Sequence, residues 1–122
     1  MKQIGIFNVT RNQLDNVFTE GHKGIAINTM AGKSIKIEGF VIYQMDDGSK
    51  SIKIFDTDGR DYYTSSQVFI KNLIEYLQTL DDAEFPATVN IVEEKSQKGR
   101  TYYTIAEAVN TFDNNAWRSL TF

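Results

Sequence analysis

Hydrophobic and polar positions alternate between residues 34 and 65, in a pattern typical of antiparallel strands. The first run, "SIKIEGFVIYQM" at residues 34–45, is rich in β-branched side chains. An Asp-Gly turn separates it from "SIKIF" at residues 51–55, and a second Asp-Gly turn precedes "RDYYTS" at residues 60–65. These runs predict a three-stranded antiparallel meander.

The period of the pattern changes after the third run. Apolar residues recur every three to four positions, which predicts an amphipathic helix over residues 65–80 with Ser65 or Ser66 as its N-cap. Alternation returns in "ATVNIVEE" at residues 87–94 and in "RTYYTIAEAV" at residues 100–109, with the turn "KSQKG" between them. This second region predicts a β-hairpin.

The order of three strands, one helix and two strands predicts a mainly β fold. We expect an OB-fold, a five-stranded antiparallel barrel with one helix between strands 3 and 4. Gly39 stands midway along the first strand, where such a barrel needs a sharp bend or a bulge. Residues 35–109 would form the barrel, residues 1–34 an N-terminal extension packed on it, and residues 110–122 a tail.

Charge and composition limit the function classes. The 122 residues suffice for one domain, and the net charge of −3 argues against a nucleic-acid binder that relies on an overall positive field. The distribution is uneven, because residues 81–94 carry acids without bases and residues 95–104 carry bases without acids. There is no cysteine and no apolar run long enough to cross a bilayer. We therefore expect a cytoplasmic protein with no membrane partner.

Enzymatic motifs are missing from the sequence. The single histidine, His22, cannot form a typical zinc site without cysteines, and no serine lies in a nucleophile elbow. A Gly-Lys-Ser sequence at residues 32–34 lacks the earlier glycine of a phosphate-binding loop, because Ile27 stands there. The sequence thus predicts a protein that is not an enzyme and holds no metal or cofactor.

The remaining candidate chemistry is aromatic and basic residues on the predicted strands. Rings stack on the bases of single-stranded nucleic acid while lysine and arginine neutralise its phosphates. Each Tyr-Tyr pair, one in "RDYYTS" and one in "RTYYTI", is expected to place one ring in the core and the other toward a ligand. The predicted nucleic-acid-binding residues are Lys36, Lys53, Phe55, Tyr62, Tyr63, Lys95, Lys98, Arg100, Tyr102 and Tyr103. Which tyrosine of each pair faces the ligand is open, and alternating aromatics are also common in ordinary strand packing.

The order of these motifs resembles that of the single-stranded-DNA-binding proteins of tailed bacteriophages. "IKIFDTDGRDYYTSS", the helix "QVFIKNLIEYL" and "VNIVEEKSQKGRTYYTI" carry the resemblance, which covers about residues 33–108. It implies an OB-fold that coats single-stranded DNA during replication or recombination with little sequence preference. It points to Phe55, Tyr62 or Tyr63, Lys98, Arg100, and Tyr102 or Tyr103 as site residues.

Two points stay open. The resemblance implies replication or recombination proteins as partners of the C-terminal tail, but this tail is short and holds one acid, Asp113, unlike the long acidic tail of bacterial proteins with the same function. The alternative is a protein-interaction module on the same barrel, such as a phage inhibitor of a host protein, with the acids of residues 81–94 on its surface. The sequence does not fix the oligomeric state, monomer or dimer.

Overall fold

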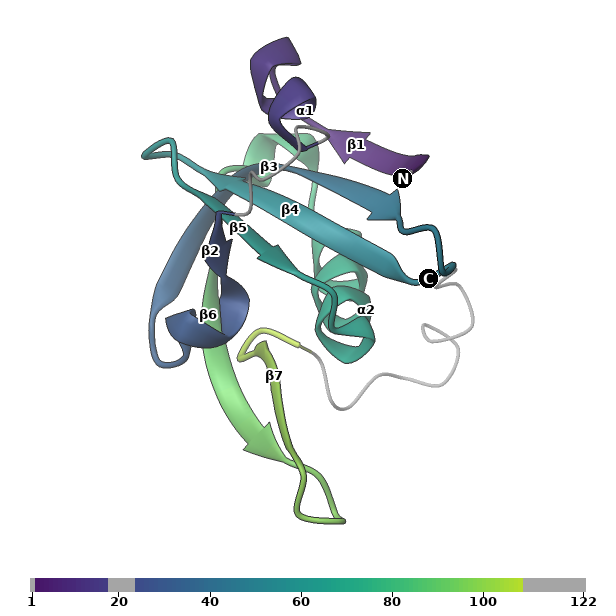
Figure 1. Ribbon diagram of the computed structural model, residues 1–122. Helices are drawn as coiled ribbons and strands as arrows, with labels where there is room; N and C mark the ends of the chain where they lie inside the picture. Colours follow the sequence, from purple (N-terminus) through teal and green to yellow (C-terminus); the bar gives the residue numbers. More distant parts are fainter. Residues whose placement is uncertain (1, 18–23, 109–122) are drawn as a thin grey trace.

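The computed structural model describes residues 2–17 and 24–108, which form a mainly β structure with a strongly curled, half-barrel sheet and few helices (Figure 1). The expectation of a mainly β, barrel-like fold is confirmed. The elements in chain order are β1 (Lys2–Phe7), α1 (Arg11–Val17), β2 (Ile25–Ala26), the 3-10 helix η1 (Ile27–Met30), β3 (Ser34–Gln44), β4 (Lys50–Asp56), β5 (Asp61–Thr64), α2 (Gln67–Leu77), the 3-10 helix η2 (Asp82–Glu84), β6 (Ala87–Lys95) and β7 (Thr101–Ile105).

The predicted elements of the central region are present. The meander is β3, β4 and β5, with antiparallel pairing between successive strands. Helix α2 follows it and begins after Ser66, whose side-chain oxygen accepts a hydrogen bond from the Phe69 amide at 3.3 Å. Strands β6 and β7 form the predicted antiparallel hairpin. The division of the chain at residues 34 and 109 stays a prediction.

Strand β3 organises the sheet because it has different partners along its length. Its first half, from Ser34 to Ile37, pairs with β6, and its second half pairs with β1. Both partners lie on the same edge of β3, since β4 pairs with the opposite edge from Ile37, where β6 also pairs, to Gln44, where β1 also pairs. The sheet therefore changes direction near the middle of β3.

Gly39 lies at this change of direction, as the sequence predicts. The register of β3 against β4 shifts between Ile37 and Gly39. A Cβ atom at position 39 would overlap the backbone carbonyl oxygens of Phe7 and Asn8, where the end of β1 passes over β3. The glycine is needed for this close approach of two backbones.

The order of paired strands is β2-β5-β4-β3-β6-β7, with β1 added beside β3. Short β2 runs parallel to β5 and occupies the edge of β5 that β4 leaves open. Within the described part of the chain, β7 pairs only with β6. The curl of the sheet is thus not closed by a β5–β7 pair.

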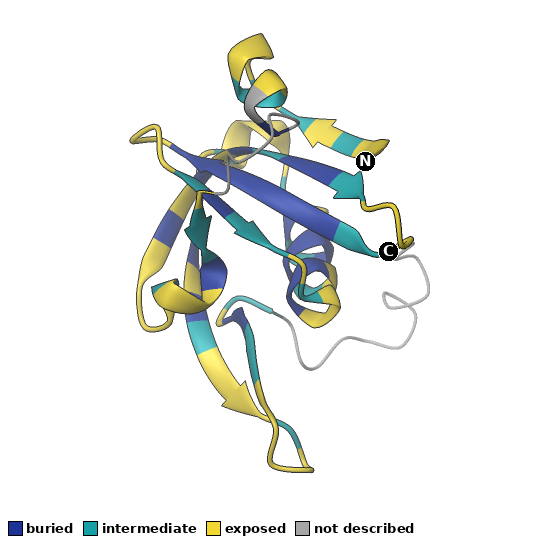
Figure 2. Cartoon of the chain, in the orientation of Figure 1, coloured by how far each residue is buried: buried dark blue, intermediate teal, exposed yellow. Residues whose placement is uncertain are grey.

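The main core fills the inside of the curl and is covered by α2. Isoleucines of β3 and β4 pack there against the apolar face of the helix, and Phe69, Ile70 and Leu73 are fully buried. A second, smaller cluster of Val17, Val41 and Phe55 lies on the other side of the sheet. Strand β4 is consequently buried on both faces from residue 51 to residue 56 (Figure 2). Of the helices in residues 2–17 and 24–108, none has the length and apolar content needed to cross a bilayer.

Candidate nucleic-acid interface

The outer face of β4 carries Lys53 and Phe55, the basic and aromatic pair predicted to face a ligand. Both side chains are buried, with exposed fractions of 2% for Lys53 and 4% for Phe55. The expectation that they lie bare on the surface is wrong. For Phe55 the reason is the N-terminal region, because Val17 of α1 packs on its ring, with Val9 and Leu14 beside it.

Lys53 is neutralised within the protein. Its Nζ atom lies 2.9 Å from Oδ2 of Asp61, a residue of the neighbouring strand β5. A buried ammonium group needs such a partner, because removal from water is costly for an isolated charge. In this structure the charge of Lys53 is thus buried and paired with Asp61, and it does not lie on the surface.

The first tyrosine pair is divided between the two faces of the sheet. Tyr62 lies in the main core with 2% of its surface exposed, and its hydroxyl donates a hydrogen bond to Oδ2 of Asp56 at 2.8 Å. Burial, assisted by this contact with Asp56, raises the pKa of Tyr62 above its usual value. Tyr63 is half-buried on the opposite face, paired with Lys53 across the strands. Tyr62 is thus the core ring, and Tyr63 is the ring left partly exposed.

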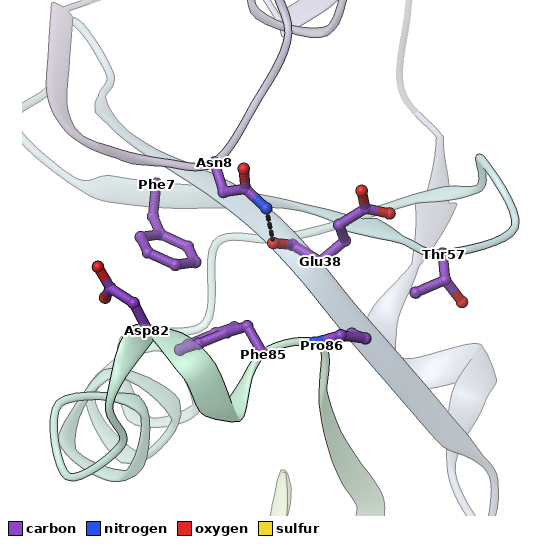
Figure 3. Close-up of a pocket in the computed structure, with 7 residues that line it drawn as sticks. All are labelled: Phe7, Asn8, Glu38, Thr57, Asp82, Phe85 and Pro86. Carbon is purple, nitrogen blue, oxygen red and sulfur yellow. Dashed lines mark hydrogen bonds between the residues drawn. The ribbon is translucent and has the colours of Figure 1, made fainter.

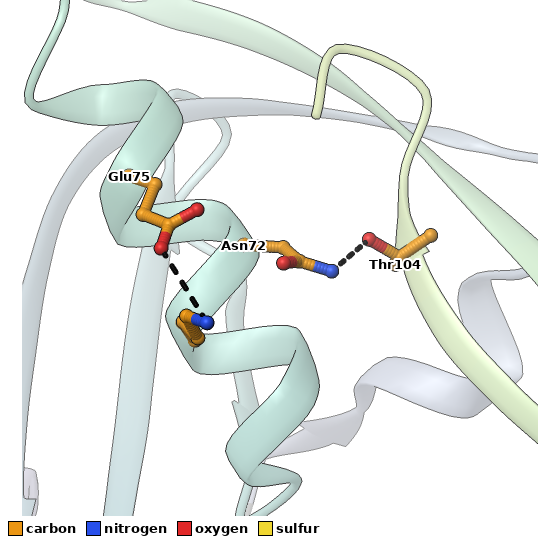
Figure 4. Close-up of polar contacts among 4 residues, drawn as sticks. Asn72, Glu75 and Thr104 are labelled. Atoms are coloured by element: carbon orange, nitrogen blue, oxygen red, sulfur yellow. Dashed lines mark hydrogen bonds and ion pairs between the residues drawn. The ribbon is translucent and has the colours of Figure 1, made fainter. Parts of the chain in front are cut away.

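The second pair is divided in the same way. Tyr103 packs against the main core, and its hydroxyl lies 3.5 Å from Oε1 of Glu93. Tyr102 is half-buried on the other face and lines a hollow of about 320 Å³ between β7 and α2. A hydrogen bond joins α2 to β7 beside this hollow: Nδ2 of Asn72 donates to the hydroxyl oxygen of Thr104 at 2.8 Å (Figure 4).

The three predicted cations of the β6–β7 turn, Lys95, Lys98 and Arg100, are all exposed. The Ser96 amide donates to the Arg100 carbonyl at 2.8 Å, and Gly99 adopts a φ of 78°, which suits a glycine in a tight turn. None of the three cations forms an ion pair with another residue of the described ranges. The hairpin extends away from the body of the protein (Figure 1), so the three charges face solvent.

Lys36 is exposed on β3, but it lies far from the hairpin turn. It pairs with Thr88 on β6, whereas Tyr102 pairs with Glu94. These two positions on β6 are separated by about 20 Å in an extended strand. The structure therefore brings Lys95, Lys98, Arg100 and Tyr102 together on one hairpin, and leaves Lys36 and Tyr63 apart from it.

Sequence reasoning missed the residues that cover the outer face of β4. Leu14 and Val17 are three positions apart, which is a helical spacing, but they lie in a polar stretch where the signal is weak. Tyr43 of β3 packs against the same cluster as Val41 and is half-buried, and this burial raises its pKa. Its position is typical of a strand residue, and nothing in the sequence distinguishes it from a core tyrosine.

Comparisons of the chain with protein-family models, curated proteins and solved structures find no match. The prediction about the C-terminal tail and its partners, and the prediction about His22, fall outside the described residues. Among the residues that the structure describes, no three histidine, aspartate or glutamate side chains are grouped so that they could hold a metal ion.

Proposed function

We propose that this chain is a single-stranded-DNA-binding protein that contacts DNA first through the β6–β7 hairpin. The observation that carries the proposal is the combination of three exposed cations, Lys95, Lys98 and Arg100, with the half-exposed ring of Tyr102 on one hairpin. Cations of this kind neutralise phosphates, and each base stacked on a ring contributes about 1–3 kcal/mol to binding. Neither contact reads the base sequence, so little sequence preference is expected.

The pattern of strand pairing supports an OB-fold as the frame for this interface. If β3 to β7 are taken as its five strands, the first pairs with the second and the fourth, the second pairs with the third, and the fourth pairs with the fifth. The helix α2 lies between the third and the fourth strand, as in that fold. In an OB-fold the loop between strands four and five borders the nucleic-acid site, and here this is the turn with the three cations.

The outer face of β4 has a different role in this proposal from the one that the sequence suggests. Val9, Leu14 and Val17 cover Phe55, so DNA bound to the structure as described reaches the rim of that face, where Tyr63 is half-exposed. The contact with DNA is consequently concentrated on the hairpin. Together with the resemblance to phage proteins, this supports a non-enzymatic protein that coats single strands in the host cytoplasm during replication or recombination.

The number of cations limits the affinity. Glu93 and Glu94 lie on the same hairpin, and Glu94 is paired directly with Tyr102. Three phosphate contacts on a single strand give a slope of about −2 for the logarithm of the binding constant against the logarithm of the salt concentration. We therefore expect weak to moderate binding that decreases with added salt.

The test is a fluorescence titration with a thymidine oligonucleotide and with a duplex of the same length, at two salt concentrations. The protein should bind the single strand more tightly than the duplex, with the salt slope given above. The double variant Lys98→Glu/Arg100→Glu should lose at least about tenfold in affinity, because two attractive contacts become repulsive.

The matched control is Lys2→Glu/Lys33→Glu, which makes the same change of charge at two exposed lysines away from the hairpin turn. It should reduce affinity far less than the hairpin variant. Equal losses in both variants would mean that only net charge matters, and no binding of the single strand by the wild type would reject the proposal.

A further inference from the structure

An apolar groove of about 460 Å³ lies between β1, the end of α2 and the region of η2. Ile42, Ile74 and Leu77 line its floor, and all three are buried. Ile4 and Ile6 of β1 also line it, and they remain 47% and 46% exposed. Large aliphatic side chains exposed at the border of a groove are a common feature of protein–protein contacts.

A second hollow, of about 550 Å³, adjoins the groove and shares Phe7, Asp82 and Phe85 with it. Figure 3 shows the two rings on one side of this hollow, with the side chains of Asp82 and Glu38 at its border. The ring centroids of Phe7 and Phe85 are 4.5 Å apart. The hollow thus combines aromatic surface with carboxylates.

The charged side chains that line the two hollows within residues 2–17 and 24–108 are acidic. No lysine or arginine of these ranges lines either hollow. Within the described part of the chain, the carboxylates of Glu38 and Asp82 form no ion pair. Carboxylates repel the phosphates of nucleic acid, whereas an ammonium or guanidinium group is attracted both to them and to the faces of aromatic rings. The chemistry of this surface therefore favours a cationic peptide over DNA.

Strand β1 adds a further feature to this surface. One of its edges pairs with β3, and no strand in residues 2–17 or 24–108 pairs with its other edge. An unpaired strand edge beside side-chain pockets is a site where an extended peptide can add as a further strand.

We propose that this surface binds an extended segment of a partner protein that carries a lysine or arginine beside aliphatic or aromatic residues. The cation enters the hollow between Phe85 and the carboxylates of Glu38 and Asp82, and the apolar side chains occupy the groove along Ile4 and Ile6. This site is separate from the hairpin turn, because β6 runs from Ala87 beside Pro86 to Lys95 at the turn, a length of about 26 Å. A partner and DNA can therefore bind at the same time.

The experiment selects peptides from a displayed library of random twelve-residue sequences on the immobilised full-length protein. Enriched peptides should contain lysine or arginine next to apolar residues. Synthetic copies of them should bind the variants Asp82→Lys and Ile4→Ser at least about tenfold more weakly than the wild type.

Two matched controls separate this result from general effects. Asp58→Lys reverses an exposed carboxylate on the β4–β5 turn, and Val68→Ser removes an aliphatic side chain of similar exposure, 49%, on α2. Neither residue lines the groove, and both variants should bind the peptides as the wild type does. All four variants should retain binding to the thymidine oligonucleotide, so a failure of the DNA proposal would not be confused with a failure of this one.

Three outcomes would overturn the inference. The first is enrichment of peptides without cations, or of peptides that bind Asp82→Lys as tightly as the wild type. The second is a dimer in sedimentation velocity that Ile4→Ser dissociates, which would assign the groove to a second copy of this chain. The third is peptide binding only by a variant that ends at Ala108, which would assign the groove to the chain's own residues 109–122.

Discussion

Lys53 and Lys98 have opposite environments although the same reasoning selects both from the sequence. Each is a lysine with an aromatic residue two or four positions away on a predicted strand or turn. Lys53 is buried within the sheet and paired with Asp61, whereas Lys98 is exposed at the β6–β7 turn. The alternation of residues in a strand determines which side chains share a face, but only the rest of the chain determines whether that face is covered.

The largest difference in stability between the covered face of β4 and the exposed hairpin is expected for substitutions at Phe55 and Tyr102. Phe55→Ala should destabilise the protein by about 3–5 kcal/mol, because it leaves a cavity between β4 and the covering residues Leu14 and Val17. Tyr102→Ala, on the exposed hairpin, should cost less than about 1 kcal/mol. Urea denaturation followed by circular dichroism measures both values. Similar costs for the two variants would show that the outer face of β4 is not covered in solution.

A second test removes the partner of the buried lysine. Asp61→Ala should destabilise the protein by about 3 kcal/mol, at the low end for a broken buried ion pair because Asp61 is itself partly exposed. Asp58→Ala, at an exposed position of the preceding turn, is the control and should change stability by less than about 0.5 kcal/mol. An Asp61 variant as stable as the control would mean that Lys53 does not depend on Asp61 for its charge to be tolerated.

The third test concerns the hydroxyl of Tyr62. Tyr62→Phe removes the hydrogen bond to Asp56 and should cost about 2 kcal/mol, as expected for a buried hydrogen bond to a charged group. Tyr63→Phe, on the half-exposed face, is the matched control and should have little effect on stability.

The raised pKa of Tyr62 also predicts a dependence on pH. Below the pKa of a free tyrosine, about 10, the folded and unfolded states both keep the proton and stability does not change. Above it the unfolded state loses its proton first, so stability falls as the pH rises toward the higher pKa of the folded state. This decrease should be smaller in Tyr62→Phe, and Tyr43, whose pKa is also raised by burial, should contribute to the decrease that is left. Equal decreases in the variant and the wild type would contradict the burial of Tyr62.

The smallest effect on stability is expected at the hairpin. Lys98→Glu/Arg100→Glu should change the free energy of unfolding by less than about 0.5 kcal/mol, because both side chains are exposed and unpaired within the described residues. A thermal melt measures this. A large loss of stability would mean that these cations hold the hairpin in place and are not free to contact DNA.

The elements that the sequence predicts correctly are those that can be recognised from the pattern of neighbouring residues. Alternation identifies β3, β4, β6 and β7, a three-to-four period identifies α2, and Gly39 marks the bend. The division of each tyrosine pair also follows from alternation, since neighbouring residues of a strand point to opposite faces.

What the sequence does not reveal depends on contacts between distant segments. The burial of Phe55 involves Val9, Leu14 and Val17, which come about 40 residues earlier and have only a short helical pattern. The parallel pairing of β2 with β5 involves two residues of β2, too few for any periodicity. The groove beside β1 likewise forms from three separate parts of the chain.

The most direct test of the proposed interface is photocross-linking of a 5-bromodeoxyuridine oligonucleotide to the wild-type protein, followed by mapping of the linked peptides. The proposed function predicts links at residues 95–103, with Tyr102 the main site and Tyr63 a minor one. Links at Phe55, or links spread evenly over the surface as on an acidic protein that does not bind DNA, would contradict a DNA interface on the hairpin.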